Sequence, residues 1–182
     1  MRIAVLIAFL IAAPSTAAAA PKPADPLDAL FVSLAKAPSE EAAKPIETQI
    51  EALFDQSGSA SVDLLMTRAG AAAAADDKDT AKKLIDAITD IAPDFAEGWH
   101  RRAALQADAG DDEGAILSLQ RAVTLNPREF AALAELGDVL ESYGDKKAAL
   151  AMYRKALALD PHLEGVDKHV DQLSRDVEGE KI

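Results

Sequence analysis

The residues of this chain best suited to chemistry gather in the phrase GWHRRA, residues 98–103. The phrase holds His100, Arg101 and Arg102 beside the only tryptophan, Trp99. Arginine binds carboxylates with two parallel hydrogen bonds, and histidine changes charge near neutral pH. The first question is whether this cluster forms a working surface or is a packed and solvated stretch of helix.

A catalytic or metal centre needs groups with matching roles close together, and the sequence shows none. His162 and His169 lie seven residues apart, too far for the usual spacing of neighbouring metal ligands. Ser57, Ser59 and Ser61 lie beside no base and are expected to cap the helix that follows. Cysteine is absent, which excludes disulfides, thiolate metal sites and cysteine nucleophiles. We therefore expect no enzyme activity, no metal and no cofactor.

The acidic charge narrows the range of partners. The 182 residues carry a formal net charge of −12. Nucleic acids and anionic lipid headgroups both favour a basic surface, so neither is expected to bind. The charge by itself indicates no more than good solubility.

The first residues, MRIAVLIAFLIAAPSTAAAA, have the three parts of a secretory signal peptide. Arg2 is basic, residues 3–13 are apolar, and small residues follow. The apolar run is shorter than the roughly 20 residues of a membrane-spanning helix. We expect a signal peptide at 1–19, a proline-rich leader at 20–26 and a periplasmic or secreted protein, with a retained anchor as the alternative. After cleavage no membrane insertion is expected.

A period of 34 residues runs through the middle of the chain. It is marked by Pro93, Pro127 and Pro161, each of which follows an apolar helical pattern. Proline stops a helix because it has no N–H and restricts the residue before it. Each period therefore predicts two helices, the second opened by an aspartate. Four further sets share the spacing: Asp77, Asp111 and Asp145; Ala81, Ala115 and Ala149; Leu65, Trp99 and Leu133; and Ile85, Leu119 and Tyr153.

These residues resemble the tetratricopeptide repeat family. The family pattern combines a large residue, a Leu-Gly pair, a small alanine and a closing proline. The third period matches best, through Leu133, Leu136, Gly137, Ala149 and Pro161. The resemblance implies an all-α fold, a right-handed α-solenoid of antiparallel helix pairs. The implied repeats are residues 62–95, 96–129 and 130–163.

Both ends of such a stack need a cover for their apolar faces. After the last repeat, an apolar stripe from Leu163 to Val177 predicts a capping helix at residues 164–178. The same stripe could instead pair two copies of the chain. Residues 27–58 predict a helix pair, and Phe31 lies 34 residues before Leu65. We interpret this pair as a degenerate repeat, in which Pro45 kinks the second helix or marks its start.

The resemblance also implies a concave groove, lined by the first helix of each repeat, in which family members hold a peptide. Some members capture a terminal carboxylate with lysines and asparagines at these positions, and that set is absent here. We expect Arg101 and Glu135 to form a salt bridge between neighbouring repeats. The groove residues expected to bind a partner are Met66, Gly70, Glu97, His100, Arg101, Ala104, Glu135 and Asp138.

Three residues near the groove have two readings each. Trp99 occupies the position of a large packing residue, and its alternative is an exposed anchor for a partner. Arg68 and Arg102 stand where the family prefers leucine. They either pair with carboxylates of a neighbouring helix or contact an anion or carboxylate of a ligand.

The sequence thus implies an exported scaffold in the cell envelope that binds a peptide or protein partner through its groove, in envelope assembly or maintenance. Two alternatives remain open. The chain could be a subunit or regulator of an envelope enzyme complex, or a homo-oligomeric structural protein.

Overall fold

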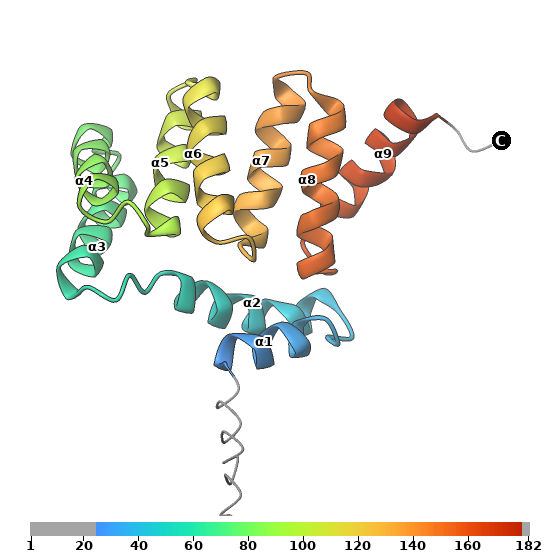
Figure 1. The fold of residues 1–182 in the computed structure, drawn as a ribbon, viewed down its shortest axis with the longest axis horizontal. Coiled ribbons are helices and arrows are strands. Elements are labelled where there is room, and N and C mark those ends of the chain that lie inside the picture. The colour runs from blue at the N-terminus through green and yellow to red at the C-terminus, as the bar shows by residue number, and fades with distance from the viewer. Residues whose placement is uncertain (1–24, 180–182) are drawn as a thin grey trace, which may run out of the picture.

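A computed structural model describes residues 25–179, and every regular element in that range is an α-helix (Figure 1). The expected all-α class is thereby confirmed. Among these helices none is both long and apolar enough to span a bilayer. The predicted signal peptide and most of the leader lie outside the described residues, so export stays a prediction. The helices are α1 (Pro26–Leu34), α2 (Glu40–Phe54), α3 (Ala60–Ala74), α4 (Lys78–Ile91), α5 (Ala96–Asp108), α6 (Asp112–Leu125), α7 (Phe130–Ser142), α8 (Lys146–Leu159) and α9 (Val166–Glu178).

Three helix pairs, α3–α4, α5–α6 and α7–α8, stand side by side (Figure 1). The aspartates of the repeat open the second helix of each pair. The side chains of Asp77, Asp111 and Asp145 accept hydrogen bonds of 3.0–3.1 Å from backbone N–H groups in the first turn. The three repeat prolines follow the ends of α4, α6 and α8 by two residues each. Local capping and proline termination therefore place the helices as the period predicts.

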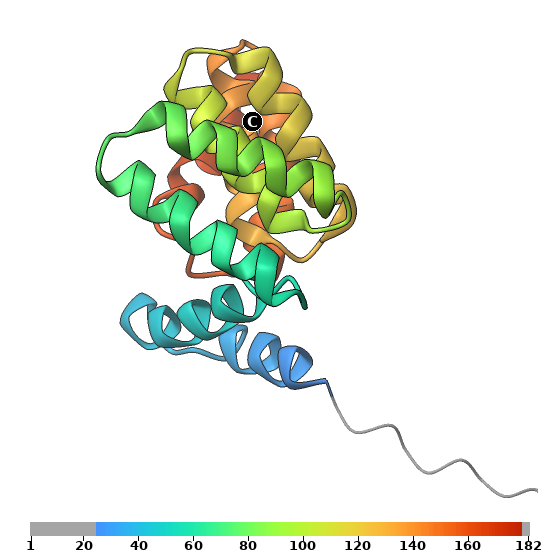
Figure 2. The same ribbon diagram turned by 90° about the vertical axis from the view of Figure 1, so that its left-hand side faces the viewer.

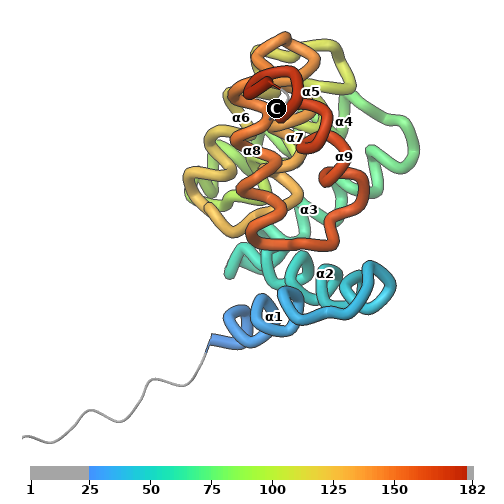
Figure 3. Tube along the Cα trace, turned by 90° about the vertical axis from the view of Figure 1, so that its right-hand side faces the viewer, coloured from blue at the N-terminus to red at the C-terminus, as the bar shows by residue number. Residues whose placement is uncertain are grey.

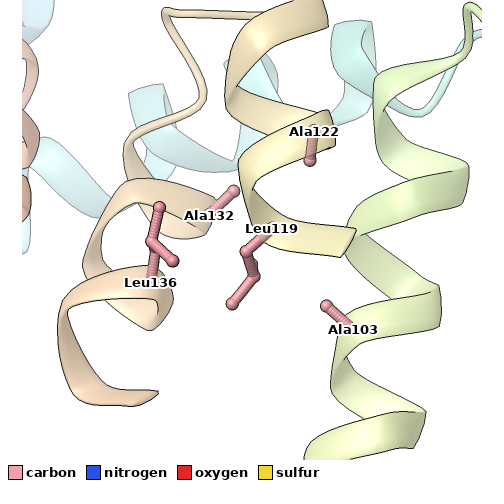
Figure 4. Close-up of a cluster of buried hydrophobic side chains, with 5 residues drawn as sticks. All are labelled: Ala103, Leu119, Ala122, Ala132 and Leu136. Carbon is pink, nitrogen blue, oxygen red and sulfur yellow. The ribbon is translucent and has the colours of Figure 1, made fainter. Parts of the chain in front are cut away.

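Small residues let the helices approach closely. Ala103, Leu119, Ala122, Ala132 and Leu136, from α5, α6 and α7, meet in one buried cluster (Figure 4). Most members of this cluster are alanines, so the backbones of the helices lie near one another. The core there is aliphatic. The repeat alanines in α4, α6 and α8 are buried as well.

The carboxy-terminal helix α9 packs beside α8 and covers the end of the stack (Figure 3). Val166 and Leu173 are buried, and Leu163 and Val170 pack on the same cluster. Of the predicted stripe only Val177, at 36% exposure, faces solvent. The apolar stripe of α9 is thus buried against the chain's own helices. Pairing of two copies through this stripe would require α9 to separate from α8.

The amino-terminal pair α1–α2 does not form the layer before α3. It runs beneath the row of helix pairs, across the lower ends of their helices (Figures 1 and 2). Leu34, Ala43 and Ile50 pack on Phe130 at the start of α7. Phe31, which the period would place beside the next repeat, instead lies with its ring centroid 6.3 Å from that of Phe130.

Polar contacts fix the pair in this position. Arg128 donates to Asp28 with an Nη1–Oδ1 distance of 2.7 Å, and its guanidinium lies over the Phe31 ring. The ring nitrogen Nε2 of His162 is 2.7 Å from the carbonyl oxygen of Ala37 and donates to it. Pro45 lies inside α2, which begins at Glu40, so Pro45 does not mark the start of that helix.

Candidate functional site

An open cavity of about 640 Å³ lies between α3 and α5 and contains four of the predicted groove residues. We call it the concave groove. Met66 and Gly70 come from α3, and Arg101 and Ala104 come from α5. The residues share one side of each first helix because they recur three or four positions apart. The remaining wall includes Asp55, Asp63, Ala73, Ile85, Leu105 and Asp108.

A second cavity of about 230 Å³ adjoins the groove, and Asp55 and Arg101 line both. We call it the acidic pocket. Three of the other four predicted groove residues, Glu97, His100 and Glu135, lie here. Its walls come from the end of α2, from α5 and from the start of α7, and carry five carboxylates: Glu51, Asp55, Glu97, Glu129 and Glu135.

His100 is the centre of the acidic pocket. Its Nδ1 lies 2.8 Å from Glu129 Oε1 and 3.3 Å from Glu97 Oε2. Its Nε2 lies 3.0 Å from Glu135 Oε2. Only 12% of the His100 side chain is exposed, so the imidazole joins two neighbouring repeats in a partly dry environment.

The predicted Arg101–Glu135 salt bridge is wrong, because His100 takes Glu135. Arg101 instead pairs along its own helix, with Nε 2.5 Å from Glu97 Oε1, and reaches Asp55 at 3.5 Å. Residues four apart on a helix are neighbours, so this partner is available whatever the adjacent repeat presents.

The carboxylates control the charge of the pocket. Burial would lower the pKa of His100, but the close carboxylates of Glu129, Glu135 and Glu97 outweigh burial and raise that pKa to about 12. Burial raises the pKa of Glu129 to about 6. Burial also acts to raise the pKa of Glu97, yet the contacts with His100 leave it lowered. An imidazolium among carboxylates is therefore the charge state of the pocket near neutral pH.

Sequence reasoning missed Glu51, Asp55 and Glu129. Glu129 immediately precedes α7, outside the first-helix positions from which the groove was assigned. Glu51 and Asp55 belong to the end of α2, whose location depends on the unexpected docking of α1–α2. No periodic signal in the sequence marks any of these three residues.

The two arginines that replace leucine lie outside both cavities. Arg102 is 3.6 Å from Asp86 and donates to Thr89 Oγ1 at 3.3 Å. It also lies over the Trp99 ring, 5.5 Å from the centroid. These contacts favour the paired reading for Arg102. Arg68 is exposed and forms no ion pair with any residue of the range 25–179.

Trp99 also lies outside the groove and packs against the cluster of Figure 4. This contact favours its packing role over that of an anchor. Asp138 is likewise away from both cavities, and accepts a 2.6 Å hydrogen bond from the hydroxyl of Tyr153. Asp138 thus serves the α7–α8 contact in this structure.

The serines near α3 form no catalytic arrangement with a histidine. Ser59 precedes α3, but its side chain makes no capping hydrogen bond. Instead Ser57 donates through both its backbone N–H and its hydroxyl to Asp63 Oδ1. The expected capping by Ser59 is wrong. The loop before α3 is held instead by the two hydrogen bonds from Ser57 to Asp63.

Three stacked helix pairs with a helical cap define an α-helical repeat protein. Residues 130–163 match the family model described as tetratricopeptide repeat. A TPR repeat-containing protein of Rhizobium etli is 27% identical over 163 residues, which cover 90% of this chain and 80% of that protein. The chain is therefore similar to tetratricopeptide repeat proteins, through the family model at residues 130–163 and through this relative over most of its length.

Further likenesses cover smaller parts of the chain. Cellulose synthase operon protein C of Escherichia coli K12 is 45% identical over 71 residues, which cover 37% of this chain and 6% of that protein. The Sgt2 TPR domain from Aspergillus fumigatus superposes with a TM-score of 0.60 at 23% identity, covering 66% of this chain and 81% of that domain. The first TPR of Spaghetti (RPAP3), bound to an HSP90 peptide, superposes with a TM-score of 0.60 at 17% identity. The superposition covers 64% of this chain and 93% of that domain. These structural likenesses concern the fold.

Proposed function

We propose that this chain is a non-enzymatic scaffold that holds an extended or helical segment of a protein partner in the concave groove. The observation that carries the proposal is the groove itself, an open cavity of about 640 Å³ between the first helices of two repeats. Gly70, Ala73 and Ala104 leave room along its walls, and Met66, Ile85 and Leu105 supply apolar contacts. A concave surface of this composition suits a peptide better than a flat protein face.

The charges of the groove favour a basic segment. Asp55, Asp63 and Asp108 line the wall, while the one cation there, Arg101, is already paired with Glu97 and Asp55. A partner with lysine or arginine beside aliphatic residues would complement this wall. Such binding should weaken with salt, because exposed charges are screened.

Two of the structural neighbours are complexes with a peptide. One is the RPAP3 domain with its HSP90 peptide. The other is the Yersinia enterocolitica chaperone SycD in complex with a peptide of the translocator YopD, at 14% identity and a TM-score of 0.60. These complexes support the proposal that this fold binds peptides. The basic character proposed for the partner of the present chain rests on the acidic side chains of its own groove.

We further propose that the scaffold acts in the cell envelope, in assembly or maintenance, after export and cleavage behind Ala19. The support is the signal-like composition of residues 1–19. Intact-mass measurement of the protein from a periplasmic fraction tests this. A mass that begins at Ala20 is expected, whereas full-length protein in the cytosol would contradict export.

Selection from a displayed library of random peptides tests the groove. Enriched peptides should carry lysine or arginine beside aliphatic residues. Ala104→Arg should weaken their affinity by about tenfold or more, equivalent to about 1.4 kcal/mol, because Ala104 is exposed in the groove. Ala151→Arg is the matched control, since Ala151 is also an exposed helical alanine but lies on α8, outside the groove. Equal affinity for both variants would reject the groove as the binding site.

A further inference from the structure

We propose that Glu97, His100 and Glu129, in the wall of the acidic pocket, bind a divalent transition-metal ion. This site is separate from peptide binding, and its test does not depend on the proposed function. One donor atom of each residue lies within 4.8 Å of the others.

Two helical elements bring the donors together. Glu97 and His100 are three residues apart on α5, so their side chains project from the same face of that helix. Glu129 directly precedes α7 and reaches back from the next repeat. The separations of His100 Nδ1 from Glu129 Oε1 and Glu97 Oε2, 2.8 and 3.3 Å, are near the roughly 3.3 Å edge of a tetrahedron with bonds of about 2.0 Å.

Glu129 supplies the observation that points to a ligand. It is 2% exposed, and both carboxylate oxygens are buried without an accepted hydrogen bond. Although Oε1 lies close to His100 Nδ1, the contact does not have hydrogen-bond geometry. A buried carboxylate without hydrogen bonds is costly. A metal ion bound to these oxygens would remove that cost.

The surroundings orient His100 as a ligand. Glu135 Oε2 lies 3.0 Å from Nε2 and accepts a hydrogen bond from it, so Nδ1 faces Glu97 and Glu129. Nδ1 is protonated in the metal-free protein, and a metal ion would release that proton to the solvent as it binds the nitrogen. Metal-bound histidines are commonly held in this way by a carboxylate on the other ring nitrogen. Arg101 similarly holds Oε1 of Glu97 and leaves Oε2 toward His100.

The donor set selects the class of ion. One imidazole nitrogen and two carboxylates suit zinc, manganese or ferrous iron better than magnesium, which takes oxygen ligands and retains its water. The charges of Glu97 and Glu129 balance a dication. The adjacent acidic pocket of about 230 Å³ gives an approach from solvent and space for water at the remaining coordination positions. A bound ion would tie α5 to α7 and so fix two repeats together.

Isothermal titration of the purified, chelator-treated protein with zinc chloride tests the site, with magnesium chloride as the reference ion. We expect one zinc ion per chain and an affinity at least tenfold above that for magnesium. His100→Ala and Glu129→Gln should each weaken zinc binding by at least tenfold. Glu135→Gln should weaken it about tenfold, because it removes only the group that orients the imidazole.

His169→Ala is the matched control. His169 also lies 3.0 Å from a carboxylate, that of Glu141, but it is exposed and has one such neighbour in place of three. Its removal should leave the zinc affinity unchanged. Circular dichroism verifies that each variant is folded, and Glu129→Gln, which keeps the shape of the side chain, decides the matter if His100→Ala unfolds. Absence of saturable zinc binding by the wild-type protein, or equal losses in His169→Ala and Glu129→Gln, would overturn the proposal.

Discussion

The indole N–H of Trp99 donates a hydrogen bond to the carbonyl oxygen of Pro93, with nitrogen and oxygen 3.0 Å apart. Arg121 from α6 reaches the same carbonyl at 3.4 Å. The proline that closes one repeat is therefore bonded to both helices of the next. Trp99, the only tryptophan of the chain, therefore links one repeat to the next through this hydrogen bond.

Shortening Trp99 should destabilise the fold in two steps. Trp99→Phe removes the hydrogen bond and should lower the free energy of unfolding by about 1 kcal/mol. Trp99→Ala also removes the packing on the cluster of Figure 4 and should cost about 3–5 kcal/mol. Urea denaturation followed by circular dichroism measures both. Unchanged stability with loss of peptide binding would instead make Trp99 an anchor for the partner.

Gly137 of the Leu-Gly pair should not tolerate a side chain. A Cβ at this position would lie 2.5 Å from Cε1 of Tyr153, whose ring is fully buried on α8. Gly137→Ala should therefore force α7 and α8 apart and cost about 1–3 kcal/mol. Thermal and urea unfolding of the variant measure the loss.

Gly70 provides the control for that substitution. It also lies inside a helix, but a Cβ there would meet nothing within 4 Å. Gly70→Ala should raise the free energy of unfolding by about 0.5–1 kcal/mol, because alanine has the higher helix propensity. A similar loss in both glycine variants would show that the Tyr153 contact is not the cause.

Asp76 marks the weakest turn of the three repeats. It has a φ of +56°, where the equivalent turns use Gly110 and Gly144 at +75° and +94°. Because glycine enters this region without a Cβ clash, Asp76→Gly should stabilise the protein by about 0.5–1 kcal/mol. Gly110→Ala should have the opposite sign. Differential scanning calorimetry distinguishes them, and a destabilising Asp76→Gly would mean that its carboxylate has a role the turn does not explain.

The docking of α1–α2 should weaken as pH rises. Burial, and then the nearby carboxylate of Asp160, raise the pKa of Glu47 from 4.5 to about 7. The folded protein therefore holds this proton more tightly than the unfolded chain does. Stability from Glu47 is present below about pH 4.5 and is lost as pH rises through about 7. Lys44, Glu51 and His162 are the other ionisable groups that face this carboxyl pair.

Glu47→Gln tests this dependence. The amide keeps a donor for Asp160 at every pH, so the variant should lose less stability than the wild-type protein between pH 5 and pH 8. Asp171→Asn, an exposed change on α9, is the control and should follow the wild-type curve. Melting temperatures across the pH range provide the comparison. Parallel curves for Glu47→Gln and the wild-type protein would show that Glu47 does not control the docking.

The repeat architecture could be derived from the sequence because its signals are local. An aspartate such as Asp111 caps the helix that begins at the next residue, and a proline such as Pro127 ends one just before it. These interactions span a few residues and recur every 34, so their positions do not depend on distant parts of the chain. The concave position of Met66, Gly70 and Ala104 follows from the same helix geometry.

The acidic pocket and the place of α1–α2 were decided by tertiary structure alone. Arg128 meets Asp28, and His162 meets the backbone of Ala37, across more than half of the chain. Such contacts arise because Phe130 and the end of α8 present an apolar surface that α1–α2 can bury, and no periodic pattern records that preference. The choice of His100 over Arg101 as partner of Glu135 likewise depends on side-chain direction across two repeats, which only the packed helices fix.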